Sequence, residues 1–367
     1  MADPTIREKG QRLPRFTRAG EDVLPFRMEE RDVLGWRWLH DCRFLPAEYL
    51  LLLLPGSEQQ LTRRMQKWYH GGYVDRIRTG LTEWIYAMAN KGANAVCVRY
   101  DRERGRIDWN KKNTELKDVY FRAHTVSTAK FRVALEMGLR QKAFPEAQEL
   151  VAHWPAEQHQ AAMHGALAVL RRQNTAARWS SDEFEAKART VILEHLVPGM
   201  LPQIRLSTLK DVPPITPTVR LSDKGPEAQL YYTDEKGKRR RIIPDWSFTL
   251  IDSNDELDFF LETDRSTMTN HDFFLKLRAY WVFWKQQQEL SKQGSPALTT
   301  FRVLTTCRSR ERFENLRSLA RDVDDKQTGS EMFWFAEESD IDPHRPEGIW
   351  QPIWQTPRDD RVHHVLE

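Results

Sequence analysis

The sequence RIIPDWSFTLIDSNDELDFFLETD, residues 241–264, decides the fold that we expect for the surrounding chain. Apolar side chains stand at every second position from Pro244 to Leu250, which is the period of a half-buried β-strand. Turn-forming residues follow over 252–256, and β-forming residues resume over 257–261. The segment therefore predicts a β-hairpin.

The predicted hairpin brings acidic side chains together. With the turn centred between Ser253 and Asn254, Asp245 lies opposite Glu262, and opposed residues in such strands have Cα atoms roughly 4.5–5.5 Å apart. Asp264 follows Glu262 by two positions and points to the same face. Three carboxylates on one patch repel one another unless a cation lies among them, and a hard divalent ion takes oxygen ligands. Spacing alone leaves this metal site and a solvated acidic face as equal alternatives.

The composition indicates packed globular structure in two or three domains, because the 367 residues are 40% hydrophobic and include 13 tryptophans. The formal net charge of +3 means that any nucleic-acid binding must depend on local basic patches. Three widely spaced cysteines predict free thiols in a reducing compartment. The apolar run at 49–54 is too short to cross a bilayer and no secretory signal is seen, so we expect a cytoplasmic protein without a membrane partner.

The N-terminal third predicts helices followed by strands. Residues 1–25 are polar, contain three prolines and are expected to be a flexible tail. The next elements are helices and then strands, expected in order over 32–42, 45–54, 58–70, 73–77 and 83–89, with a further short helix starting near Lys91. Three helices followed by a β-wing is the order of a winged helix-turn-helix. We therefore expect a DNA-binding domain over 26–117.

The third of these helices, 58–70, is the expected recognition helix. It presents three cations within about one turn, Arg63, Arg64 and Lys67, among glutamines and a tyrosine. Arginine and glutamine can contact base edges, and lysine can hold phosphates. The alternative is an ordinary solvated helix face.

Residues 118–367 predict an α/β sandwich with a helical insertion at about 155–215. Its expected elements alternate between helices and strands after a long first helix. They are helices at 119–141, 156–172, 181–195, 269–290 and 309–323, and strands at 218–221, 229–233, 300–305 and 331–336, besides the hairpin itself.

Pro244-Asp245, a hairpin and then Glu262-x-Asp264 resemble the nuclease fold whose signature is PD-(D/E)XK. That fold uses two acids to bind Mg²⁺ and a lysine two residues after the second acid. Asp264 occupies the lysine position here, so the resemblance assigns the lysine role to Lys276 in the following helix. It implies Asp245 and Glu262 as ligands of Mg²⁺ or Mn²⁺, with Lys276 stabilising developing charge, and Asp264 on the same face is expected to be an auxiliary ligand. Without the resemblance, Lys276 would be interpreted as a surface lysine.

A basic run, Lys236-Gly-Lys-Arg-Arg-Arg241, leads directly into the acidic strand. Arg239, Arg240 and Arg241 could hold a phosphate backbone across the site. The alternative is a solubilising edge strand, because basic residues protect sheet edges from pairing. The chain has no phosphate-binding Gly-rich lysine loop, no HExxH motif and no nucleophile elbow, which disfavours an ATPase, a zinc protease or a hydrolase.

Several segments together resemble the replication-relaxation proteins encoded on bacterial plasmids and integrative elements. The most specific is Glu262-Thr-Asp-Arg-Ser-Thr267; the others start at Ile85, Phe121, Phe131, Ile243, Phe259, Lys276, Arg302 and Arg312. The resemblance implies a winged-helix DNA reader joined to a nuclease-like domain.

The sequence thus leads to the hypothesis of a DNA-binding protein of a mobile genetic element with a Mg²⁺-dependent endonuclease domain, acting in replication or mobilisation. One rival is a catalytically inactive DNA-binding regulator or replication accessory factor that keeps the nuclease fold as a scaffold. Another is an interaction protein whose helices at 150–200 recruit a replication or defence partner. The expected partners of the preferred hypothesis are DNA and replication or mobilisation proteins. Recognition of paired half-sites would call for a homodimer.

Overall fold

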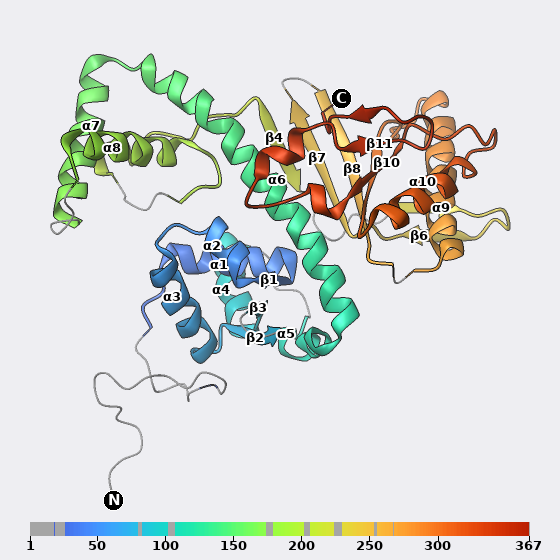
Figure 1. The fold of residues 1–367 in the computed structure, drawn as a ribbon, viewed down its shortest axis with the longest axis horizontal. Helices are drawn as coiled ribbons and strands as arrows, with labels where there is room; N and C mark the ends of the chain where they lie inside the picture. The colour runs from blue at the N-terminus through green and yellow to red at the C-terminus, as the bar shows by residue number, and fades with distance from the viewer. Residues whose placement is uncertain are drawn as a thin grey trace, which may run out of the picture. The chain divides into compact units, whose positions relative to one another are not determined.

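The computed structural model describes residues 18, 26–79, 83–101, 107–173, 179–201, 206–223, 230–252, 255–266 and 268–366. Over these residues the chain is a mixed α/β protein, as predicted (Figure 1). It divides into two compact units, Met1–Ala129 with Ala147–Ile215, and Lys130–Glu146 with Thr216–Glu367. The domain limits expected from the sequence stay predictions. The expected tail lies, apart from Arg18, outside the described residues.

The N-terminal elements follow the predicted order with one addition. They are α1 Glu30–Cys42, β1 Phe44–Pro46, α2 Ala47–Leu53, α3 Glu58–His70, β2 Val74–Thr79, β3 Glu83–Met88 and α4 Asn90–Tyr100. The sheet order in this part of the described chain is β1-β3-β2. The short strand β1 was not predicted, because its residues are all buried and show no alternation that a sequence pattern could reveal.

The packing of α3 explains why this helix is amphipathic. Ser57 caps it by accepting a hydrogen bond from the backbone N–H of Gln60. Leu61, Met65 and Trp68 recur at helical spacing and are buried. The polar side chains between them therefore form the exposed face of the helix.

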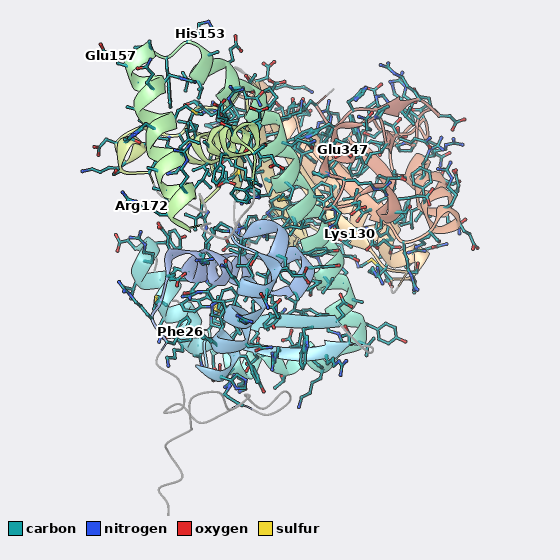
Figure 2. The ribbon with its side chains drawn as sticks, turned by 60° about the vertical axis from the view of Figure 1, so that its left-hand side comes forward. Phe26, Lys130, His153, Glu157, Arg172 and Glu347 are labelled. Carbon is teal, nitrogen blue, oxygen red and sulfur yellow. The ribbon has the colours of Figure 1, made fainter. Side chains whose placement is uncertain are left out.

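The next part of the chain is helical. It comprises α5 Trp109–Lys112, η2 Asn113–Lys117, α6 Val119–Ala152, α7 Ala156–Gln173, α8 Ser181–Leu196 and η3 Ser207–Leu209. Figure 2 labels His153 at the end of α6 and Glu157 and Arg172 near the two ends of α7. The predicted end of α6 near residue 141 was wrong, because the helix continues through Pro145. A proline removes one helical hydrogen bond, but Ala143 and Ala147 on either side are buried and keep the helix packed.

A large sheet forms the centre of the C-terminal unit. Its strands, among the described residues, are β4 Val219–Asp223, β7 Trp246–Asp252, β8 Asp255–Asp264, β9 Arg302–Cys307, β10 Phe333–Glu337, β11 Trp354–Gln355 and β12 Val362–His363. Their order is β12-β11-β10-β9-β8-β7-β4, with β8, β9 and β10 parallel and the other neighbours antiparallel. Trp246 pairs with Leu261, which confirms the predicted hairpin register, although the turn residues Ser253 and Asn254 lie outside the described residues.

Helices cover both faces of this sheet. The middle of α6 packs on one face through Phe131 and Leu135, in a cluster that contains Leu261. On the other face lie α9 Asn270–Lys292 and α10 Arg310–Arg321, in a cluster that contains Phe260 (Figure 1). Successive residues of β8 thus enter different cores, as strand geometry requires. Glu262 is in phase with Phe260 and faces α9.

Smaller elements complete the chain. The strands β5 Leu230–Thr233 and β6 Arg239–Ile242 form a separate two-stranded sheet, and the short helices η4 Glu338–Asp340 and η5 Pro346–Trp350 follow β10. Cys42, Cys97 and Cys307 are buried free thiols, as predicted. None of the helices in the described ranges is long and apolar enough to cross a membrane.

Candidate functional site

The hairpin brings two of the predicted acids together. Asp245 immediately precedes β7 and donates its backbone N–H to the carbonyl of Leu261 at 3.0 Å. Its Oδ2 accepts a hydrogen bond from the backbone N–H of Thr263 at 2.7 Å. These two hydrogen bonds join Asp245 to the residues before and after Glu262, so Asp245 lies beside Glu262 on the opposite strand. Glu262 itself is only 2% exposed. Two carboxylates therefore share one end of the sheet, as the predicted register requires.

Two side chains of α9 approach Glu262 from above the strand. The ammonium of Lys276 donates to Oε2 of Glu262, and the hydroxyl of Tyr280 donates to Oε1 at 2.6 Å. Residues four apart share a helix face, so α9 presents both groups to one carboxylate. The structure confirms the proximity of Lys276 to this acid. Sequence reasoning missed Tyr280, and its spacing from Lys276 is the signal that could have found it.

The charges of the site are unbalanced. The pKa of Glu262 is raised to about 7, mainly because the side chain is buried; Lys276 opposes the rise and Asp245 adds to it. Burial alone would lower the pKa of Lys276, but the carboxylates of Glu262 and Asp245 outweigh burial and raise it. Burial and the neighbouring Glu262 raise the pKa of Tyr280 well above its usual value, so its hydroxyl remains a donor. When both acids are ionised, two negative charges face one ammonium.

Asp264 is held elsewhere. Its carboxylate forms a two-point ion pair with Arg312 of α10, with Nε to Oδ2 at 2.7 Å and Nη2 to Oδ1 at 3.1 Å. The backbone N–H of Ser266 donates to the same Oδ2 at 3.1 Å. Arg312 also donates to the carbonyl of Met268 at 2.9 Å, so the pair joins β8, the start of α9 and α10. The third predicted acid is therefore compensated by an arginine.

The remaining donors suit one divalent cation. Among the residues that the structure describes, no group of three or more His, Cys, Asp or Glu side chains is placed to hold a metal ion. Asp245 and Glu262 nevertheless offer four carboxylate oxygens between them, and a carboxylate oxygen can accept more than one contact. Two carboxylates completed by water are a donor set that Mg²⁺ accepts. Asp245 and Glu262 could thus hold one such ion, whereas Asp264, the third predicted ligand, is paired with Arg312.

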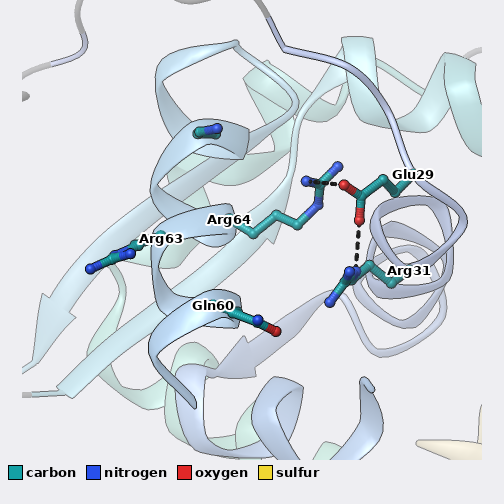
Figure 3. A pocket seen from close by; sticks show the side chains of 6 residues that line it. Glu29, Arg31, Gln60, Arg63 and Arg64 are labelled. Carbon is teal, nitrogen blue, oxygen red and sulfur yellow. Dashed lines mark hydrogen bonds and ion pairs between the residues drawn. The ribbon is translucent and has the colours of Figure 1, made fainter. Parts of the chain in front are cut away.

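The three predicted cations of α3 have different roles. Arg64 forms an ion pair with two oxygens of Asp32, which is fully buried, and its Nη1 lies 2.7 Å from Oε1 of Glu29. Arg63 is exposed and, in Figure 3, points away from Glu29, whereas Arg64 points toward it. An open pocket of about 240 Å³ lies along this helix, lined by Glu29, Arg31, Gln60, Arg63, Arg64 and Lys67. Arg64 therefore anchors α3, while Arg63 lies on its outer surface.

The three predicted arginines of β6 are all exposed. Arg240 forms an ion pair with Asp234, with Nε to Oδ2 at 2.8 Å. The guanidinium of Arg239 lies 4.0 Å from the ring centre of Tyr231, and Arg241 pairs with Tyr231 across the two-stranded sheet. The basic run thus belongs to a separate hairpin, which packs on α9 and directly precedes the acidic hairpin in the sequence.

The raised pKa of Glu262 predicts how stability depends on pH. The folded protein binds the Glu262 proton more tightly than the unfolded chain, whose pKa is near 4.5. The resulting stabilisation is complete below pH 4.5 and is lost as the pH rises through about 7. The unfolding free energy of the wild type should therefore fall more steeply with pH in this window than that of Glu262→Gln. Denaturant unfolding in EDTA measures both, and equal slopes would contradict the assignment.

The different surroundings of Arg63 and Arg64 predict unequal costs of substitution. Arg64→Ala leaves the buried carboxylate of Asp32 without its ion pair, which should lower the unfolding free energy by about 3 kcal/mol. Arg63→Ala removes an exposed side chain and should change it by less than about 0.5 kcal/mol. Denaturant unfolding of the two variants makes the comparison. An equal loss for both would show that Arg64 is not an anchor.

Comparison with known proteins gives one family. The family model described as replication-relaxation matches residues 36–298, which is more than half of the chain. No curated protein and no solved structure matches the chain.

Proposed function

The chain belongs to the replication-relaxation family, which links it to the replication or mobilisation of mobile genetic elements, and from this premise we propose that it is a DNA-binding protein with a Mg²⁺-dependent endonuclease site. The observation that carries the proposal is the convergence of Asp245, Glu262 and Lys276. They come from the residue before β7, from β8 and from α9, three elements whose order along the chain suits a PD-(D/E)XK-like domain.

The acidic site supports phosphodiester hydrolysis through charge. Mg²⁺ held by Asp245 and Glu262 would supply the positive charge that lowers the pKa of a bound water. Lys276 is 23% exposed at its side chain, so its ammonium can leave Glu262 and donate to a phosphate oxygen that gains charge. Tyr280 would keep Glu262 in place during this exchange, because its hydrogen bond comes from inside the core.

Asp264 and Arg312 have a positioning role in this proposal. Their ion pair fixes the end of β8 against α10 and the start of α9. The lysine that would normally follow the second acid is absent, and the ammonium comes from the neighbouring helix instead. A shift of α9 against β8 would therefore move Lys276 away from Glu262, and the Asp264–Arg312 pair opposes that shift.

The N-terminal unit supports DNA binding. The order α1-β1-α2-α3-β2-β3 suits a winged helix with α3 as its recognition helix. The exposed side chains of α3 are of types that contact bases and phosphates: Gln59, Thr62, Arg63 and Gln66. Lys67 lines the open pocket along the same helix. Arg64 would act indirectly, by holding α3 against α1.

A second candidate is a DNA-binding protein that keeps this domain as an inactive scaffold. It is favoured by the ion pairs that the acids already form within the protein: Lys276 neutralises Glu262, and Arg312 neutralises Asp264. The two proposals differ in whether Mg²⁺ can compete with Lys276 for Glu262.

A cleavage assay separates these candidates. Full-length protein is incubated with supercoiled, linear and single-stranded DNA in Mg²⁺ or Mn²⁺, beside Asp245→Asn and Arg63→Ala. Asp245→Asn should lower the cleavage rate by about a hundredfold or more, because it removes charge from the site, while leaving DNA affinity in EDTA unchanged. Arg63→Ala should weaken affinity and spare the rate at saturating protein. Wild-type protein that binds all three DNAs and cuts none would favour the scaffold.

A further inference from the structure

The β5–β6 hairpin has a rigid tip. Asp234 accepts hydrogen bonds from the backbone N–H groups of Lys236 at 3.0 Å and Lys238 at 2.9 Å, and from Nε of Arg240 at 2.8 Å. Gly237 takes a left-handed conformation at φ +73°, which glycine adopts without strain. Arg240 is therefore paired with an acid of its own hairpin turn.

The inner side of this hairpin is fixed to α9. Leu230, Tyr232 and Ile242 join the hydrophobic cluster that α9 forms. Gln286 of α9 accepts from the backbone N–H of Thr233 at 2.9 Å and donates to its carbonyl at 2.7 Å. The helix that carries Lys276 and Tyr280 therefore also holds the hairpin in place.

The outer side combines an aromatic ring with two cations. Tyr231 is 40% exposed, Arg239 lies over its ring at 4.0 Å, and Arg241 stands directly opposite it on β6. Alternation along the strand puts these three side chains on one side, away from Ile242. Exposed arginines beside an exposed ring suit a ligand that has both phosphates and unstacked bases.

We propose that this outer side binds an unpaired DNA strand, with a base stacked on Tyr231 and phosphates held by Arg239 and Arg241. The inference rests on the proposed function and narrows its substrate. In a duplex the base faces are covered by their neighbours and could not stack on the ring, whereas in a single strand they can. An edge strand that served only to keep the protein soluble would need the two arginines but no exposed aromatic ring beside them.

The position of the β5–β6 hairpin on α9 gives the distance between the hairpin and Lys276. Gln286 follows Lys276 by ten residues, which corresponds to about 15 Å along a helix. At the duplex rise of about 3.4 Å per nucleotide this is roughly four nucleotides, and an unpaired strand, which is more extended, covers the distance with fewer. The substrate is therefore DNA with an unpaired region close to the attacked phosphate, such as a fork or an unwound origin, and not an intact duplex.

The test measures binding without cleavage. Fluorescence anisotropy in EDTA compares oligothymidine with a blunt duplex of equal length, using the full-length wild type, Tyr231→Ala and Tyr231→Phe. Tyr231→Ala should weaken oligothymidine binding about tenfold and leave duplex binding unchanged, because only the stacked base is lost. Tyr231→Phe keeps the ring and should bind as the wild type does.

The arginines are tested by salt dependence, with Arg240→Ala as the matched control. Between about 50 and 200 mM salt, the double variant Arg239→Ala/Arg241→Ala should reduce the slope of log affinity for oligothymidine by about 1.4. Arg240→Ala removes the same kind of charge from the same strand, but its partner is Asp234, so its effect on the slope should be smaller. Unfolding curves confirm that each variant is folded.

Two results would overturn the inference. One is an unchanged oligothymidine affinity of Tyr231→Ala, or an equal loss for the duplex. The other is an effect of Arg240→Ala as large as that of Arg239→Ala/Arg241→Ala together. Failure of the endonuclease proposal is distinguishable, because a protein that never cuts would still show the predicted differences in binding. A wild type that binds neither DNA would contradict both.

Discussion

The contact between Glu262 and Lys276 is the constraint on which the C-terminal unit depends. A carboxylate at 2% exposure is costly unless it is neutralised, and here burial and the nearby Asp245 raise its pKa to about 7. The ammonium of Lys276 and the hydroxyl of Tyr280 are the two groups that offset this cost. Both belong to α9, so the chemistry of one buried side chain fixes how that helix lies on the sheet. The same packing would prepare the site for a divalent ion, because it keeps the carboxyl groups of Asp245 and Glu262 close together.

The structure separates anchoring charges from exposed charges. Arg312 on Asp264 and Arg64 on Asp32 are ion pairs with a buried carboxylate, and such pairs hold elements together but are no longer available to bind a ligand. Arg63, Arg239 and Arg241 lie instead on exposed surfaces. A chain with a net charge of only +3 must place its few surplus cations locally, and these positions are where the two proposed DNA contacts fall.

The sequence predicted regular elements well and side-chain pairing less well. The alternation in β7 and the turn chemistry were enough to fix the register of Trp246 with Leu261, because a slip by one residue would turn every buried side chain outward. The predicted starts of the helices at residues 58 and 269 likewise agree with α3 and α9, which Ser57 and Thr269 cap in the structure. The sequence could not reveal that Arg312, 48 residues after Asp264, would take that acid out of the patch, because such a contact depends on how α10 packs. It missed Tyr280 because a tyrosine on an apolar helix face is ordinarily a core residue, although the spacing of four residues from Lys276 was a usable signal.

The central claim is that Asp245, just before β7, and Glu262, in β8, form a cation site next to Lys276. The most direct measurement is the anomalous scattering of a crystal soaked in Mn²⁺. The account predicts one Mn²⁺ bound by oxygens of both Asp245 and Glu262, with the Lys276 ammonium moved off Glu262 and Asp264 still paired with Arg312. A map without an ion between the two carboxylates, with Lys276 still in contact with Glu262 at saturating Mn²⁺, would contradict it.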